Sequence, residues 1–205
     1  MQPANHTDEH SQAGPIPQIP MPDNAREIEE PGWENRTPCD RWFIWIFCNV
    51  ILPMIETSDR EAWFKYAIPP AKTDDLVMTA IALLYSSHMN VANIDISPQV
   101  YVSHFVQLVD QRKHMKLFTD DENHQTPIAM LVVLLSQLYN HLPAFRRSHN
   151  ALLKMLSAIA SDIPMPIPQM HSARYEHYTS IRRWIRQELE FMRQRKERDN
   201  GSQSV

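Results

Sequence analysis

The chain has 205 residues, which is enough for one sizeable hydrophobic core and too few for two ordinary domains to be expected. Its formal net charge of −4 decides nothing about nucleic acid, because only a clustered basic face would supply phosphate affinity. Three glycines are too few for a phosphate-binding loop, and two cysteines, Cys39 and Cys48, are too few for a disulfide framework. Composition therefore predicts one globular domain in a reducing compartment.

Membrane association is not expected from the apolar segments. Residues 1–20 contain no apolar stretch of the secretory type, and the longest apolar runs, residues 42–55 and 128–139, are too short to span a bilayer. The chain is therefore predicted to be intracellular, either nuclear or cytoplasmic, with no membrane partner.

Residues 1–38 form a head rich in proline and acidic side chains. They contain little that could be buried, so they cannot offset the entropy lost on ordering, and we expect them to be disordered. The run Pro15–Pro22 favours an extended polyproline conformation. Order is expected to begin at Asp40, as the N-cap of the first helix of a helical core at residues 39–162.

Helical signals then follow each other along the chain. An apolar helix should run from Asp40 until Pro53 ends or kinks it, and a short helix from Ser58 should stop at the two prolines at 69–70. Thr73 is the expected cap of a helix over about residues 74–89. After a connector at 91–97, a further helix is expected over about 98–117, followed by a polar loop at 119–125.

The most apolar part of the chain is residues 128–142. Apolar side chains occupy almost every angular position of a helix from Ile128 to Leu138, which predicts a helix buried on most sides, with Leu134 enclosed. Thr126 and Pro127 give it a start and Pro143 an end, and a second amphipathic helix over 144–159 should pack antiparallel to it.

The last part of the chain is expected to be a proline-rich extended joint at 163–171, a long amphipathic helix at 172–198 and a disordered tail at 199–205. No segment longer than a few residues alternates between apolar and polar side chains with the two-residue period of a strand. The predicted fold class is thus all-α, an irregular bundle of about six to seven helices with a disordered N-terminal head.

Catalytic and metal signatures are absent from the pattern. The histidines lack close zinc-ligand spacing, the cysteines form no CxxC pair, and no GxSxG element is present. The carboxylates of residues 74–75 and 120–122 lie at a helix start and in a loop, where they suit the helix dipole or solvent. We assign no catalytic residue, no metal and no cofactor, and predict that the chain is not an enzyme.

The arginine-bearing helix at 172–198 is the one candidate site. Its functional interpretation is a face that contacts phosphate or a partner, with two aromatic anchors. The alternative is an ordinary solvated face whose arginines pair with Glu188, Glu190 and Glu197. The candidate contact residues are Tyr178, Arg182, Arg183, Trp184, Arg186 and Arg193.

Two stretches resemble the helical regulatory region of fungal zinc-cluster transcription factors. The first is FKYAIPPAKTDDLVMTAIALLYSSHMN, in which residues 81–88 match the family's pattern of leucine and small residues that ends in histidine. The second is TPIAMLVVLLSQLYNHLPAFRRSHNALLKML, in which Phe145, His149 and Leu152 match the family's aromatic, histidine and leucine positions. The resemblance covers residues 42–159. The family's DNA-binding module holds zinc through more cysteines than the two present here, so the resemblance implies a regulatory region without its DNA reader.

The leading hypothesis is therefore a helical interaction module in transcriptional regulation. It would work through protein partners, compatible with a homo-oligomer, and would reach nucleic acid only through the C-terminal helix. Trp63 and Trp184 are expected to mark its contact surface. One alternative is a viral coat or nucleocapsid subunit that assembles along RNA, and another is an all-helical enzyme or small-molecule-binding protein.

Overall fold

The computed structural model describes residues 15–16, 21, 23, 25–91, 99–114, 128–133 and 172–202, and these are helices joined by turns, with no strand among them. The predicted all-α class is confirmed. Several predictions lie outside the described residues. These are most of the head before residue 25, the connector beyond Val91, the loop at 119–125, Leu134, the second central helix at 144–159 and the joint at 163–171.

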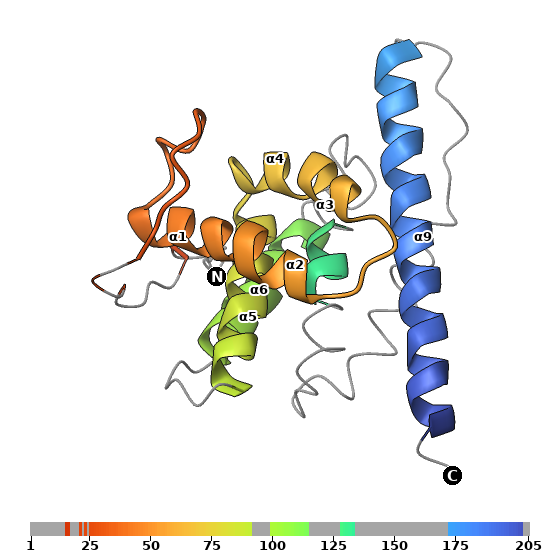
Figure 1. Cartoon of the computed structure of the whole chain (residues 1–205). Coiled ribbons are helices and arrows are strands. Elements are labelled where there is room, and N and C mark those ends of the chain that lie inside the picture. The colour runs from red at the N-terminus through yellow and green to blue at the C-terminus, as the bar shows by residue number, and fades with distance from the viewer. Residues whose placement is uncertain are drawn as a thin grey trace, which may run out of the picture.

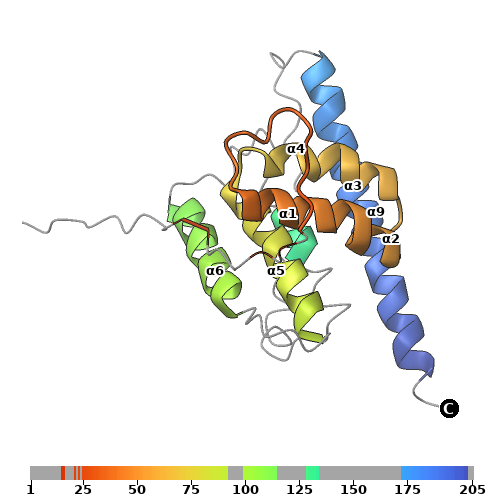
Figure 2. The ribbon, with the colours of Figure 1, turned by 60° about the vertical axis from the view of Figure 1, so that its left-hand side comes forward.

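The helices form one cluster with a long helix standing along one side (Figures 1 and 2). In chain order they are α1 (Pro38–Ile46), the π-helix η1 (Phe47–Ile51), α2 (Leu52–Met54), α3 (Arg60–Tyr66), α4 (Ile68–Ala71), α5 (Asp75–Val91), α6 (Gln99–His114) and α9 (Ser172–Ser202). Residues 128–133 are also helical.

The N-cap of helix α1 lies three residues before the predicted one. The Thr37 side chain accepts a hydrogen bond from the Asp40 N–H, and the Asp40 carboxylate accepts one from the Thr37 N–H, both at 3.2 Å. This is a capping box with Pro38 in the first turn. The prediction that Asp40 is the N-cap is wrong, because Asp40 is the reciprocal acid of a cap formed by Thr37.

Pro53 has the effect that the sequence predicts. It has no N–H to donate to the carbonyl four residues back, and the chain before it widens into the π-turn η1, where the Leu52 N–H bonds to the Phe47 carbonyl. Helix α2 ends at Met54, and Ile55 is extended.

The prolines at 69–70 do not stop the helical chain as expected. They lie in the first turn of α4, where a missing N–H costs nothing, so they begin a new helix instead of ending one. Helix α5 is capped by the Asp74 carboxylate, which accepts a hydrogen bond from the Val77 N–H at 3.0 Å, and not by Thr73.

Helix α5 is the centre of the described fold. Every residue from Leu76 to Ser87 is buried, since α1 and α6 pack against it. An aromatic cluster fills the α1–α5–α6 junction, with Phe43 5.2 Å from Tyr85 and 6.0 Å from Tyr101 between ring centroids. Residues 128–133 lie between α5 and α9 and are completely buried, which confirms the predicted enclosure for this part of the apolar run (Figure 2).

Residues 25–37, which we call the N-terminal arm, pack on the helices although they were predicted to belong to the disordered head. The arm rises beside α1 and carries Trp33, which is 1% exposed, and Arg36, which is 9% exposed (Figure 1). The expected start of order at Asp40 is therefore wrong. At the other end of the chain, α9 continues through Ser202, so the first part of the predicted tail is helical.

Candidate interaction surfaces

Helix α9 is attached to the core by the aromatic ring of Trp184. This ring meets Trp63 edge-on at 5.1 Å and lies 5.4 Å from Tyr66, both residues of α3. Trp184 is 2% exposed and Trp63 is completely buried. The expectation that these two tryptophans mark a contact surface is wrong for the folded chain, because they bury each other.

A carboxylate fixes the same helix to the linker before α3. Glu188 is completely buried, and its Oε1 accepts hydrogen bonds from the Ser58 hydroxyl at 2.7 Å and from the Asp59 N–H at 3.1 Å. Its Oε2 has no hydrogen-bond partner. Farther along α9, Arg195 lies 3.5 Å from Glu56. A buried carboxylate that is only half satisfied is costly, so this junction stabilises the docked helix less than an apolar contact of the same size would.

The outward face of α9 carries charges of both signs. Of the candidate contact residues, Arg183, Arg186 and Arg193 are exposed, whereas Arg182 is 6% exposed; Tyr178 lies on the same helix, and its side chain is not among those described. Arg193 pairs with Glu190 at 3.1 Å, one of the pairings that the solvated-face alternative predicts. The structure thus brings three of the six predicted residues to the surface.

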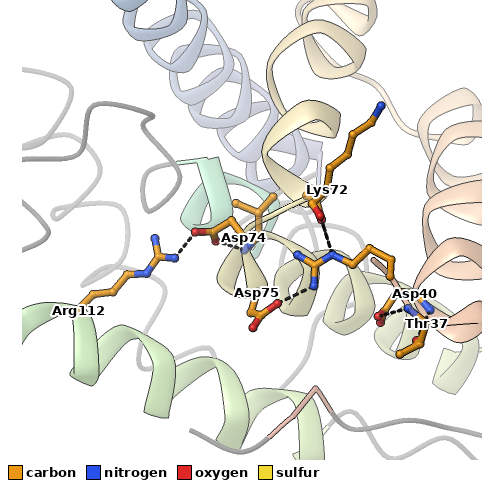
Figure 3. A network of polar contacts seen from close by, with 9 residues as sticks. Thr37, Asp40, Lys72, Asp74, Asp75 and Arg112 are labelled. Atoms are coloured by element: carbon orange, nitrogen blue, oxygen red, sulfur yellow. Dashed lines mark hydrogen bonds and ion pairs between the residues drawn. The ribbon is translucent and has the colours of Figure 1, made fainter. Parts of the chain in front are cut away.

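A polar network holds the arm to the start of α5 (Figure 3). Arg36 donates to the Ala71 carbonyl at 3.0 Å, to the Lys72 carbonyl at 3.1 Å and to the Asp75 carboxylate at 2.5 Å. On the other side of the same turn, the Asp74 carboxylate receives Arg112 of α6. The Arg36 guanidinium has several donors, so it satisfies the free carbonyls at the end of α4 and binds the first residue of α5 at the same time. The arm thus covers the junction between α4 and α5.

Further contacts hold the arm to α1 and to Lys72 between its two ends. Glu27 pairs with Arg41 at 2.6 Å. Lys72 donates to the Pro31 carbonyl at 2.9 Å and lies 5.3 Å from the centroid of the Trp33 ring. Gly32, between Pro31 and Trp33, has φ +93°, a backbone conformation that residues other than glycine rarely adopt.

An open groove of about 1450 Å³ lies between the arm and the helices. One wall consists of arm residues from 25 to 34, and the other consists of side chains from α1, η1, α3 and α4. Two aromatic side chains line the helical wall, Trp45, which is half-buried, and Phe64, which is 42% exposed. Phe64 is thus open to solvent, whereas the Arg26 guanidinium lies 5.8 Å from the centroid of the Trp45 ring.

The arm side of the groove is acidic. The residues that line the groove include four glutamates and two arginines, and one of the glutamates, Glu27, forms an ion pair with Arg41. Glu29 and Glu30 are exposed and make no ion pair within the described part of the chain. The pKa of Glu34 is lowered, chiefly by the Gly32 N–H that donates to it, so this carboxylate also stays charged.

Cys48 lies in the same groove but has no nucleophilic character. Burial, with a smaller contribution from Glu30, raises the pKa of its thiol to about 12. The thiolate is the reactive form of cysteine, so at neutral pH this residue is protonated and behaves as a small apolar side chain.

Neither a metal centre nor a membrane segment is found in the described parts of the chain. No three His, Cys, Asp or Glu side chains gather there as a metal ion would require. Over the same ranges, none of the helices combines the length and the apolar character needed to cross a bilayer.

The groove is the feature that the sequence analysis missed. The only local signal is the acidic run of Glu27, Glu29 and Glu30 before Trp33, and this run was assigned to the head. Comparison of the chain with protein-family models, with curated proteins and with solved structures found no match in any of the three.

Proposed function

We propose that this chain is a helical interaction module that acts in transcriptional regulation through protein contacts, and that the groove beside the N-terminal arm is its contact surface. The groove carries the proposal, because it combines two aromatic side chains, Trp45 and Phe64, with the exposed carboxylates of Glu29 and Glu30. Aromatic side chains that line a groove can serve as binding anchors. The link to transcription rests on the resemblance in residues 42–159, and this role implies a nuclear location.

The size of the groove favours a polypeptide over a small molecule. Sites for small ligands enclose about 300–1,000 Å³ and bury most of the ligand. This groove, at about 1450 Å³, is larger and open to solvent. A segment of a partner protein would fill it better.

The charges of the groove define the partner. Glu29, Glu30 and Glu34 lie along one wall, and Trp45 and Phe64 lie along the other. An amphipathic segment with Lys or Arg on one side and large apolar side chains on the other matches both walls. We therefore propose a basic amphipathic segment of a partner protein as the occupant.

A synthetic peptide tests this assignment directly. An amphipathic peptide with a leucine face and a lysine face should bind the full chain, perturb Trp45 fluorescence and bind more weakly as salt is raised. The same peptide with glutamate in place of lysine is the control. Equal binding of the two peptides, or binding of neither, would contradict the assignment.

Charge reversal locates the binding. Glu29→Lys with Glu30→Lys should weaken binding of the basic peptide about tenfold, which corresponds to about 1.4 kcal/mol. The matched control is Glu176→Lys with Glu197→Lys, which changes the net charge equally on exposed positions of α9. If both pairs weaken binding equally, the effect comes from the overall field and not from the groove.

The transcriptional role needs a separate test. The full chain, fused to an unrelated DNA-binding domain, should change expression of a reporter with the matching DNA site. The groove pair of charge reversals should abolish this change, and the α9 pair should preserve it. An unchanged reporter with every fusion would refute the role in transcription even if the peptide binds.

A further inference from the structure

Ser58 lies at the contact between α9 and α3. It is an exposed residue of the linker between α2 and α3, and its hydroxyl donates at 2.7 Å to the completely buried carboxylate of Glu188. One end of this hydrogen bond is thus accessible from solvent, and the other end belongs to the long helix.

The sequence around this serine is acidic. Glu56 precedes it, and Asp59 and Glu61 follow it, in the stretch Ser-Asp-Arg-Glu. A serine three residues before a glutamate often signals a capping box, but here the N-cap of α3 is Asp59, whose carboxylate accepts from the Ala62 N–H. Helix capping therefore does not require Ser58. A serine flanked by carboxylates is also what a protein kinase with a basic substrate cleft would select.

We propose that Ser58 is a phosphorylation site and that its modification releases α9 from α3. The kinase would transfer the γ-phosphoryl group of a nucleoside triphosphate to the Ser58 Oγ. A P–O bond to Oγ forms, the bond to the β-phosphate oxygen breaks, the nucleoside diphosphate leaves, and the hydroxyl proton passes to the kinase's general base.

Phosphorylation removes the donor and introduces repulsion at the same point. The hydroxyl hydrogen that Glu188 now accepts is lost, and a group of charge about −1.5 to −2 takes its place. Glu188 is shielded from water and its second oxygen has no hydrogen-bond partner, so its charge is poorly screened. Of the arginines near this junction, Arg60 donates to the Pro53 carbonyl and Arg195 lies 3.5 Å from Glu56.

Release of α9 would uncover an aromatic surface. Trp184 would leave its edge-on contact with Trp63, and apolar neighbours on the same face of α9, such as Ile185, would be exposed with it. These side chains are buried in the docked state, so the modified and unmodified chains would present different surfaces to a partner.

The full chain with its native sequence provides the first test. It is incubated with a kinase that prefers acidic substrates and with magnesium and ATP, and the sites are mapped by mass spectrometry. We expect phosphate at Ser58, faster hydrogen exchange over residues 181–192, a red shift of tryptophan emission, and reversal of both changes by a phosphatase. Absence of phosphate at Ser58 while a control peptide is modified would overturn the proposal, as would a phosphorylated chain with unchanged exchange.

Variants isolate the charge from the size of the added group. Ser58→Glu should speed exchange over 181–192, whereas Ser58→Gln, of the same size but neutral, should do so much less. Glu188→Gln combined with Ser58→Glu should restore slow exchange, because an amide can donate to the new carboxylate. If the glutamate and glutamine variants behave alike, or if the double variant exchanges as fast as Ser58→Glu alone, the charge mechanism is refuted.

Discussion

Replacement of Trp184 by alanine is the sharpest test of how α9 is held. The side chain is 2% exposed and packs against two rings of α3, at 5.1 Å from Trp63 and 5.4 Å from Tyr66. Truncation of a buried tryptophan costs about 3–5 kcal/mol, and each aromatic pair contributes about 0.5–1.5 kcal/mol beyond its buried area. We therefore expect Trp184→Ala to lower the free energy of unfolding by about 4 kcal/mol, a large fraction of the 5–15 kcal/mol typical of domains.

The measurement is urea denaturation followed by the helical circular dichroism signal. Phe64→Ala is the matched control, because Phe64 is also an aromatic residue but is 42% exposed, and its truncation should change the free energy of unfolding by about 0.5 kcal/mol or less. Trp184→Phe, which keeps a ring, should lose less than the alanine variant. A loss below about 1 kcal/mol for Trp184→Ala would show that this ring does not hold α9 to the core.

Three further predictions concern buried polar and titratable groups. Glu188→Ala should lower the free energy of unfolding by about 1–3 kcal/mol in the same urea assay, because it removes two hydrogen bonds to a buried carboxylate, while the exposed Glu190→Ala should cost about 0.5 kcal/mol or less. Stability should fall as pH rises above the ordinary thiol pKa of 9.0, because Cys48 ionises in the unfolded chain but has its pKa raised to about 12 in the fold. Cys48→Ala should reduce this dependence of stability on pH, and an equal dependence in the variant would refute the assignment to Cys48. Burial lowers the pKa of His104, against a smaller opposing effect of Asp75, so stability should also fall as pH drops below 6.5, and His104→Asn should weaken that dependence in acid unfolding curves.

Helical periodicity predicted the elements whose stability depends on one wide apolar face. The helix at 172–198 and the helix at about 74–89 were both expected, and the structure has them as α9 and α5 with ends shifted by a few residues. The break at Pro53 was also predicted, because a missing N–H acts locally. Caps were assigned less accurately. Thr37 and Asp74 each have a neighbouring polar residue that could serve, and only the folded backbone decides between them.

The N-terminal arm could not be predicted in the same way. Trp33 and Arg36 are isolated in a segment rich in proline and acid, so no period reveals them. Arg36 is held by partners far along the chain, the carbonyls of Ala71 and Lys72 and the carboxylate of Asp75, and Lys72 also lies over the Trp33 ring. Composition averages over a window and therefore assigned these residues to the head, although a few long-range contacts hold the arm in place as one wall of the groove.

The error about Trp184 has a different physical origin. A tryptophan on the apolar stripe of an amphipathic helix has the same pattern whether the stripe packs on its own core or on a partner. Glu188 is the residue that separates these cases, because its carboxylate is completely buried and bonded to Ser58 and Asp59 of the same chain. Leucine at this position would dock α9 without the cost of burying a charge. The Glu188 carboxylate adds a polar contact to the aromatic one, and because it accepts from the Ser58 hydroxyl, the phosphorylation that we propose at Ser58 would act on the attachment of α9 through charge.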